Sequence, residues 1–263
     1  MSADADELTD ADLALVYDME NPWDRRGFPQ DRFFSDAVAA ADSVLDVGCG
    51  TGSMLHVARA EGHTGRLTGV DPDPAMLGRA RRRTGLGPGL EPGSGPGPEI
   101  EWVAGTAAEL AYDAEFDLAT MASNAFQCLA DPDELRDSLT AIRRALRPGG
   151  AFVFGTRHLQ ARAWEQWNPA NAGTLTLPDG REIRGWHQVE RVEGALVTFT
   201  ETAARPDGTP LRVSRTTLRF HTPETLNPLL AAAGFTVEAQ FGDWDRGPLT
   251  DRSREIATIA RAR

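Results

Sequence analysis

Glycine recurs at every second position directly after an apolar run in the first fifth of the chain. The segment reads Val44-Leu45-Asp46-Val47-Gly48-Cys49-Gly50-Thr51-Gly52, and apolar residues continue at helical spacing from Met54 to Ala58. This pattern predicts a buried strand, a tight turn and the start of a helix. Glycine is needed where the backbone takes a positive φ or touches a ligand. A strand that feeds such a loop is typical of a site for a nucleotide-like ligand.

An acid follows the next short apolar strand. Leu67–Val70 ends in Asp71, which lies 21 residues after Gly50. A carboxylate at the tip of the second strand lies beside the glycine loop and can accept both hydroxyls of a ribose. The two motifs together predict a ligand that contains adenosine. Asp46 is also an acid in an apolar run, so we expect it to have hydrogen-bond partners.

The glycine spacing separates the possible adenosine ligands. The dinucleotide fingerprint is G-x-G-x-x-G/A, whereas this loop has G-x-G-x-G followed by Ser53. The chain contains no lysine, which excludes a P-loop and a lysine Schiff base. An NAD(P)-dependent oxidoreductase is therefore an alternative that the spacing disfavours.

Three elements together resemble the class I S-adenosylmethionine (SAM)-dependent methyltransferases. They are residues 46–52, Asp71 and the segment Leu146-Arg147-Pro148-Gly149-Gly150. The resemblance covers roughly residues 40 to 157, and more loosely the whole chain. It implies an α/β fold with a doubly wound, Rossmann-like sheet of seven strands. It also implies SAM as methyl donor, S-adenosylhomocysteine (SAH) as product and no metal.

The resemblance implies which residues hold the cofactor. The glycine loop would line the methionine and ribose, Asp71 would bind the ribose diol, and Pro72 or Met76 would lie against the adenine. Thr106 stands where the family often has an acid, so a hydroxyl or a backbone group would bind the adenine amino group. The expected cofactor residues are Tyr17, Asp46, Gly48, Cys49, Gly50, Asp71, Pro72, Met76, Thr106, Ala107 and Met121.

The methyl acceptor is expected at the carboxyl ends of the strands. His158 and His187 are candidate general bases because an unperturbed histidine titrates near neutrality; each could equally be a hydrogen-bonded wall residue. An amine acceptor needs only to be neutral when it attacks. Arg157 either binds an acidic group of the acceptor or forms a surface ion pair. The expected pocket residues are Trp23, Asn124, Gln127, Arg157, Trp164 and Trp186.

Alternation of strand and helix patterns predicts a parallel sheet with right-handed crossovers. We expect a helical cover, a SAM-binding core, a substrate-side helix and β insert, and a C-terminal helix with a strand pair that completes the core; their ranges are 1–42, 43–157, 158–222 and 223–263. The helix before the fifth strand is expected to end at Pro148. Residues 85–98, rich in glycine and proline, are expected to form a surface insertion rather than a lid.

The insert carries a further resemblance. Its antiparallel meander with Asp-Gly and Glu-Gly turns resembles that of small-molecule methyltransferases of actinobacterial secondary metabolism, including N,N-dimethyltransferases of nucleotide-linked amino sugars. In those enzymes the insert forms a wall of the substrate pocket or a dimer contact. A homodimer through the insert is therefore expected as well.

Composition narrows the acceptor to a small molecule. The net charge is −12, and all 27 basic residues are arginine, so a nucleic-acid partner is not expected. No apolar run approaches the ~18 residues of a membrane span, and the acidic start predicts no signal peptide. Two cysteines predict thiols in a reducing cytoplasm, with neither a disulfide framework nor a zinc site. We expect a cytoplasmic enzyme that methylates an oxygen or nitrogen of a metabolite; a non-catalytic SAM-binding regulator or scaffold is the main alternative, and a polyamine synthase a more distant one.

Overall fold

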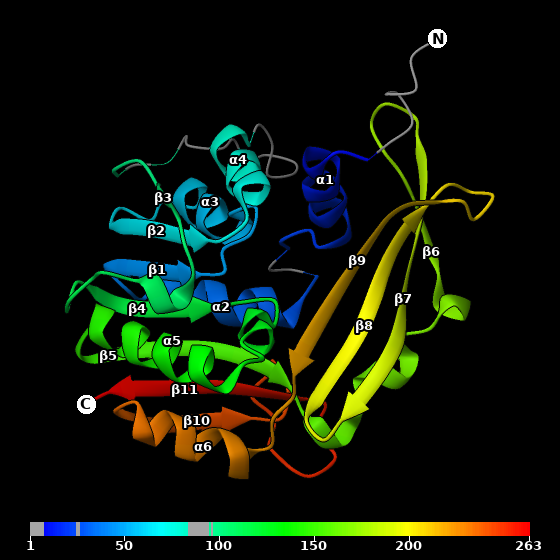
Figure 1. The fold of residues 1–263 in the computed structure, drawn as a ribbon. Coiled ribbons are helices and arrows are strands. Elements are labelled where there is room, and N and C mark those ends of the chain that lie inside the picture. Colours follow the sequence, from blue (N-terminus) through cyan, green and yellow to red (C-terminus); the bar gives the residue numbers. More distant parts are fainter. Residues whose placement is uncertain (1–7, 25–26, 84–94, 96) are drawn as a thin grey trace.

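The computed structural model describes residues 8–24, 27–83, 95 and 97–263 (Figure 1). Most of the expected surface insertion at 85–98 lies outside the described residues, so its role stays a prediction.

The larger sheet has seven strands in the order β10-β11-β5-β4-β1-β2-β3. Strands β1 to β5 run parallel to their neighbours, and β11 is antiparallel to both β5 and β10. The doubly wound sheet is therefore confirmed. The strands are β1 (Ser43–Val47), β2 (Arg66–Asp71), β3 (Glu101–Ala104), β4 (Phe116–Met121), β5 (Leu146–Arg157), β10 (Phe235–Phe241) and β11 (Glu255–Ala262).

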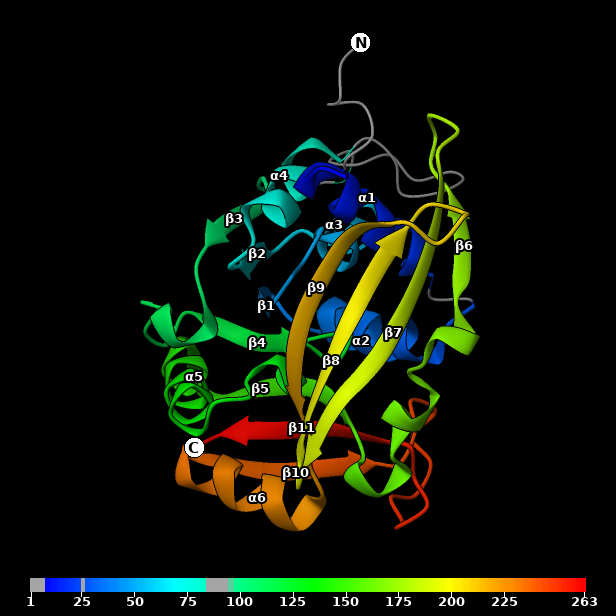
Figure 2. The same cartoon turned by 45° about the vertical axis from the view of Figure 1, so that its right-hand side comes forward.

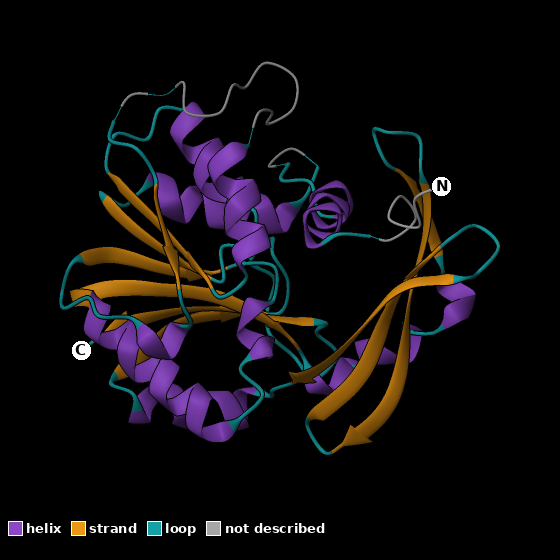
Figure 3. Cartoon of the chain, turned by 45° about the horizontal axis from the view of Figure 1, so that its top comes forward, coloured by secondary structure: helices purple, strands orange, loops and turns teal. Residues whose placement is uncertain are grey.

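Helices cover both faces of this sheet (Figure 3). They are α1 (Asp10–Glu20), α2 (Pro29–Ala39), α3 (Ser53–Ala60), α4 (Pro74–Arg82), α5 (Pro132–Ala145) and α6 (Pro223–Ala232). Asp73 caps α4 by accepting from the N–H of Ala75, and Asp131 caps α5 in the same way. Such caps satisfy backbone donors that a helix start leaves open.

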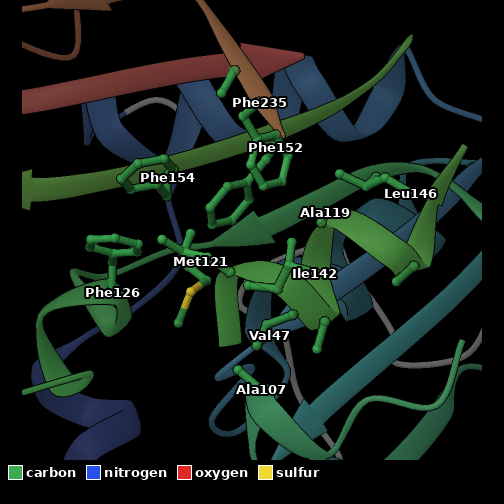
Figure 4. Packing of buried hydrophobic residues seen from close by; sticks show 14 of the residues in the cluster. Val47, Ala107, Ala119, Met121, Phe126, Ile142, Leu146, Phe152, Phe154 and Phe235 are labelled. Atoms are coloured by element: carbon green, nitrogen blue, oxygen red, sulfur yellow. The ribbon is translucent and has the colours of Figure 1, made fainter. Parts of the chain in front are cut away.

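Two buried clusters form the core, one on each face of the sheet. Neighbouring residues of a strand point to opposite faces, so Leu118 joins the cluster of α2 and α3, while Ala119 joins that of α5 and α6. Figure 4 shows the second cluster, in which Phe126 and Phe154 stack with ring centroids 4.4 Å apart. Both faces are thus closed, and open space is left at the ends of the strands.

The helix before β5 ends earlier than the sequence suggested. It ends at Ala145, Leu146 is already extended, and Pro148 lies inside β5. The residue before a proline is disfavoured in a helix, so the chain leaves the helical region before Arg147. The expected end at Pro148 was wrong by three residues.

A second, four-stranded antiparallel sheet follows β5, as expected. Its strands are β6 (Gly173–Thr176), β7 (Glu182–Glu193), β8 (Leu196–Ala204) and β9 (Pro210–Arg219), paired in that order. In Figures 1 and 2 this second sheet stands at the end of the molecule toward which β1, β2 and β4 point. One end of it packs on α1 through Ile183 and Val16, and the other packs on Trp164. It therefore faces the carboxyl ends of the parallel strands.

Candidate active site

The glycine loop has the backbone that its composition predicted. Gly50 and Gly52 have φ of 54° and 72°, a region that side chains rarely adopt. A Cβ on Gly52 would lie 2.2 Å from Cη2 of Trp102, so the loop also needs glycine for space. The N–H groups of Gly48 and Cys49 both donate to the carbonyl oxygen of Val70, at 2.8 and 3.0 Å. These bonds fasten the loop to the tip of β2.

Asp71 lies directly beside this loop. Its Oδ2 accepts from the N–H of Gly50 at 2.8 Å, and its Oδ1 accepts from the N–H of Asp73 at 2.9 Å. A carboxylate has about four acceptor positions, so each oxygen keeps room for one more donor. Burial raises the pKa of Asp71, and the two backbone donors oppose this shift. The arrangement fits a ribose diol, and we call the loop together with Asp71 the cofactor cradle.

Asp46 lies beneath the cradle on β1. It is 2% exposed, and its Oδ1 accepts from the hydroxyl of Thr120 at 2.8 Å. Burial raises the pKa of Asp46 to about 7, and the negative charge of Asp71 acts in the same direction. The expected partner of this buried acid is therefore a single hydroxyl on the neighbouring strand.

Helix α1 covers the cradle. The Cε1 atom of Tyr17 lies 3.6 Å from the position that a Cβ on Gly50 would take, and the Tyr17 hydroxyl bonds with Ser123. The cavity that Tyr17, Ser123 and the loop enclose has a volume of about 30 Å³, close to that of one water molecule. Ligand pockets usually measure some ~300–1,000 Å³. We therefore expect Tyr17 to move when a nucleoside enters.

A buried acid that the sequence analysis missed fastens this cover. Asp18 of α1 pairs with Arg79 and Arg83 of the α4 region and accepts from the hydroxyl of Thr51 in the glycine loop. Its side chain is 5% exposed. Arginines 79 and 81–83 stand out in the sequence, but their partner is distant along the chain, and no local pattern indicates it.

The residues expected near the adenine differ in exposure and in hydrogen bonding. Pro72 is exposed and Met76 is half-buried, both directly after β2. The hydroxyl and the N–H of Thr106 donate to Oε2 of Glu109, at 2.9 and 2.8 Å. The hydroxyl proton is thus engaged, and an oxygen lone pair is left to receive the adenine amino group. Ala107 and Met121 lie in the buried cluster of Figure 4, so their side chains support the cradle from below.

The turn after β4 has an unusual backbone. Ser123 and Asn124 have φ of 50° and 60°, although neither is glycine. Such conformations cost energy and concentrate at functional sites. The Oδ1 atom of Asn124 is buried and has no hydrogen-bond partner within the described part of the chain. This turn therefore holds a buried acceptor atom, without a partner in the described residues, next to Ser123, which lines the cavity beside Tyr17.

Two further cavities lie near the cradle. The first, the acceptor cavity, has a volume of about 290 Å³ and shares Trp23 and Ser123 with the small cavity beside Tyr17. The second, the distal cavity, has a volume of about 710 Å³ and shares Trp244 with the acceptor cavity. Trp244 escaped the sequence analysis. The signal was Gly155 inside β5, because a Cβ there would lie 2.1 Å from Cη2 of Trp244.

Gln127 and Arg157 form one unit at the end of β5. Gln127 is fully buried, and its Oε1 accepts from the backbone N–H and the guanidinium of Arg157, at 3.3 and 3.1 Å. Its Nε2 donates to the carbonyl oxygen of Arg219. The Arg157 guanidinium lies 5.5 Å from the ring centre of Trp167. Arg157 is therefore not the surface ion pair that the sequence left open.

The two candidate bases have different environments. His158 is 2% exposed, its Nδ1 accepts from the N–H of Gln160, and burial lowers its pKa. His187 lies on the face of the second sheet that contacts Trp167, with its Nε2 3.8 Å from Oε2 of Glu201. Only His187 is therefore open toward the acceptor cavity side.

Two tryptophans expected to line the pocket have other surroundings. Trp164 is buried edge-on against Phe220, with ring centroids 4.7 Å apart, so it packs the base of the second sheet. Trp186 precedes His187 on β7 and so points to the opposite, outer face. There it lies under Arg184. Neither position fits the expected pocket wall, because parity along the strand and burial decide the direction of each ring.

Among the described residues, no helix has the length and hydropathy of a membrane span. The same residues contain no group of three or more His, Cys, Asp or Glu arranged for a metal ion. Both cysteines, Cys49 and Cys128, are free thiols.

Comparison with known proteins identifies methyltransferases as relatives of this chain. Residues 44–150 match the family described as "Methyltransferase domain". The 2-phytyl-1,4-naphtoquinone methyltransferase of Trichormus variabilis is 30% identical over 167 residues, which are 59% of this chain and 67% of that protein. The cypemycin N-terminal methyltransferase of a Streptomyces species is 28% identical over 229 residues, 82% of each chain. The solved structure of the CcbJ methyltransferase from Streptomyces caelestis has a TM-score of 0.71 at 25% identity and covers 95% of this chain and 96% of that one.

Fold, cradle and comparisons define a SAM-using transferase. The chain belongs to the class I SAM-dependent methyltransferases. It is an enzyme, a SAM-dependent methyltransferase. This confirms the methyltransferase prediction over the oxidoreductase and the non-catalytic alternatives.

Proposed function

We propose that the acceptor atom is the nitrogen of a small-molecule amine. The observation that carries this proposal is the acidic and aromatic lining of the acceptor cavity, which includes Glu20, Asp31, Trp23 and Trp244. Carboxylates and indole faces attract a cation. No arginine among the described residues pairs with Glu20, so this acid is open to a cationic ligand.

The two acids of the acceptor cavity suit an amine that must lose a proton. Burial raises the pKa of Glu20, and the nearby charge of Glu201 adds to the shift. Burial also raises the pKa of Asp31 to about 6. A carboxyl with a raised pKa holds a proton more readily, and an amine must be neutral before it attacks. We therefore assign Glu20, together with His187, to receive the proton of the acceptor amine.

Bound SAM would supply an electrophilic methyl group on a positively charged sulfur. The nitrogen lone pair would form the new N–C bond while the S–C bond breaks, and the electrons of the S–C bond would return to sulfur. Asn124 Oδ1 accepts an N–H of the amine and aims the lone pair. The tight backbone at Gly48, where a Cβ would lie 3.0 Å from the Cβ of Ala125, keeps the turn against the cradle. Alignment of this kind is the main contribution of a protein to such a displacement.

One of the relatives supports nitrogen as the acceptor atom. The cypemycin enzyme, by its name, methylates an N-terminus. Isotope-labelled SAM, offered with matched pairs of small amines and alcohols, tests the proposal when mass spectrometry locates the label. We expect label on nitrogen. Label only on oxygen or carbon would contradict the proposal.

We also propose that the enzyme is cytoplasmic and that it forms a homodimer through the outer face of the second sheet. We further propose that the chain has the four parts 1–42, 43–157, 158–222 and 223–263. The outer face carries Trp186 and Val213, and the exposed fraction of Val213 is 54%. Light scattering of the wild type and of Val213→Asp tests the dimer. A monomeric wild type would contradict it.

A further inference from the structure

The distal cavity lies between the end of β5, the 3-10 turn Ala163–Gln166 and the loop that joins β10 to β11. Arg157 and Glu255 lie side by side in it, on paired positions of β5 and β11. The cradle does not use this cavity. At about 710 Å³ it is large enough for a substantial part of a ligand.

Arg157 is a half-buried cation without a close counter-ion. No ion pair within 4.0 Å joins it to a carboxylate among the described residues, where its guanidinium donates to the side chain of Gln127. A buried charge is costly unless it is paired. Gln127 and the ring of Trp167 fix the plane of the guanidinium. A fixed guanidinium offers parallel N–H donors that match a carboxylate or phosphate.

Glu255 does not neutralise this cation. Its Oε2 is buried without a hydrogen-bond partner in the described chain. Burial raises the pKa of Glu255 to about 7, and Arg157 opposes that shift. Near neutral pH much of this carboxyl is therefore protonated. Its proton then offers a further donor to an anion in the cavity.

The residues at the rim of the cavity also favour a negatively charged ligand. Arg252 and Arg254 are exposed at its rim. Asp243 also lines it, but its Oδ1 accepts from the N–H groups of Asp245 and Gly247 in its own turn. One oxygen of the Asp243 carboxylate is thus engaged by backbone donors, whereas Arg252 and Arg254 line the cavity.

The distal cavity adjoins the acceptor cavity at Trp244, which lines both. The acceptor cavity in turn shares Trp23 and Ser123 with the small cavity beside Tyr17 and the glycine loop. A molecule with its nucleophile beside Ser123 would extend past Trp244 to reach Arg157. The two ends of such a molecule would meet opposite charges of the protein.

We propose that the distal cavity is a subsite for an oxyanion of the methyl acceptor, a carboxylate or a phosphate, which Arg157 binds. This inference rests on the proposed function, because it describes the far end of the same acceptor. The acceptor is therefore a molecule with an amine at one end and an oxyanion at the other. Arg157 determines specificity and takes no part in the transfer itself.

Titrations with inorganic pyrophosphate and with succinate test the subsite, followed by the fluorescence of the tryptophans and by calorimetry. We expect saturable binding to the wild type and a loss of at least about tenfold in affinity for Arg157→Met, since one charged hydrogen bond alone is worth that much. Glu255→Gln should bind as tightly or more tightly, because the amide keeps a donor and cannot ionise. Arg184→Met is the matched control, because Arg184 also lies over a tryptophan but on the outer face, and it should bind like the wild type.

Preference between the two probes distinguishes a phosphate-bearing from a carboxylate-bearing acceptor. Arg157→Lys keeps the charge without the planar fork, so we expect intermediate affinity; this variant decides the matter if Arg157→Met does not fold. Equal affinity of wild type, Arg157→Met and Arg157→Lys, or no binding of either probe, would overturn the subsite. SAM titrations of the same proteins keep the two claims apart, because SAM binding without oxyanion binding rejects only the subsite.

Discussion

The carboxylate of Asp18 on the cover helix accepts from the hydroxyl of Thr51 in the glycine loop. This contact joins the first helix of the chain to the loop that receives the cofactor. Because Tyr17 is the neighbour of Asp18 and lies over Gly50, the position of the cover and access to the cradle depend on each other. We therefore expect cofactor entry to be coupled to this buried charge cluster.

Asp18→Asn should loosen this cover. Removal of one partner from a buried ion pair leaves Arg83 without its counter-charge and costs about 3–5 kcal/mol in other proteins; Arg79 is partly exposed, so we expect about 2–4 kcal/mol of lost unfolding free energy. Stopped-flow measurements should show faster SAM dissociation. Asp10→Asn is the control from the same helix, because its pair with Arg212 is exposed and should be worth under ~1 kcal/mol. Equal effects of the two substitutions would contradict the coupling.

Asp71→Ala should weaken SAM binding by about 1–3 kcal/mol, since hydrogen bonds to a charged group are lost. Calorimetry measures this directly. Asp113→Asn, an exposed acid in the turn before β4, should bind SAM like the wild type. Unchanged affinity in Asp71→Ala would remove its assigned role as the ribose acceptor.

Asp46 makes the stability of the unliganded enzyme depend on pH. Burial raises its pKa from 3.8 to about 7 in the folded state. The folded state therefore favours the protonated form, so this contribution to stability is full below the unfolded pKa of 3.8 and is lost as pH rises through about 7. Asp46→Asn should be more stable than the wild type at pH ~8, and the difference should shrink toward pH ~4. Urea titrations at both pH values measure it, and a difference that grows at low pH would contradict the sign.

Gly155→Ala should disturb the acceptor side alone. The added Cβ would lie 2.1 Å from Cη2 of Trp244, so the indole must move from the wall that two cavities share. We expect kcat/KM for the acceptor to fall about tenfold or more, with the Kd of SAM unchanged. Gly173→Ala on β6 meets no atom within 4 Å and should leave both constants unchanged. A wild-type kcat/KM in Gly155→Ala would show that Trp244 does not shape the pocket.

Substitutions of the two histidines should have different effects, one on catalysis and the other on stability. His187→Gln should lower kcat, because it removes a proton acceptor that faces Glu201. His158→Gln should leave kcat nearly unchanged and lower the melting temperature, because His158 caps a 3-10 turn from a buried position. Steady-state kinetics and thermal melts of both variants give the comparison. The reverse pattern would return His158 to the role of candidate base.

Local patterns were sufficient for the parts of the fold that depend on neighbours in the chain. The glycine loop, the acid at Asp71 and the meander after β5 follow from strand periodicity, backbone freedom and turn chemistry. The same local logic failed at Pro148, because its restriction on the preceding residue ended the helix sooner.

Features that depend on distant partners were not predictable in this way. Asp18 meets Arg79 across 61 residues, and Trp244 reaches the site from the loop before β11. Trp186 and His187 were both assigned to the pocket, yet strand parity sends them to opposite faces. A shift of one residue reverses the face of every side chain, so the direction of Trp186 needed the register that only the structure provides.

A crystal structure of the enzyme with SAH tests the central claim most directly. The account predicts ribose hydroxyls on both carboxylate oxygens of Asp71, the homocysteine sulfur between Gly48 and the Ser123–Asn124 turn, and Tyr17 displaced from Gly50. A complex with SAH bound elsewhere, or with Tyr17 still closed over the glycine loop, would contradict it.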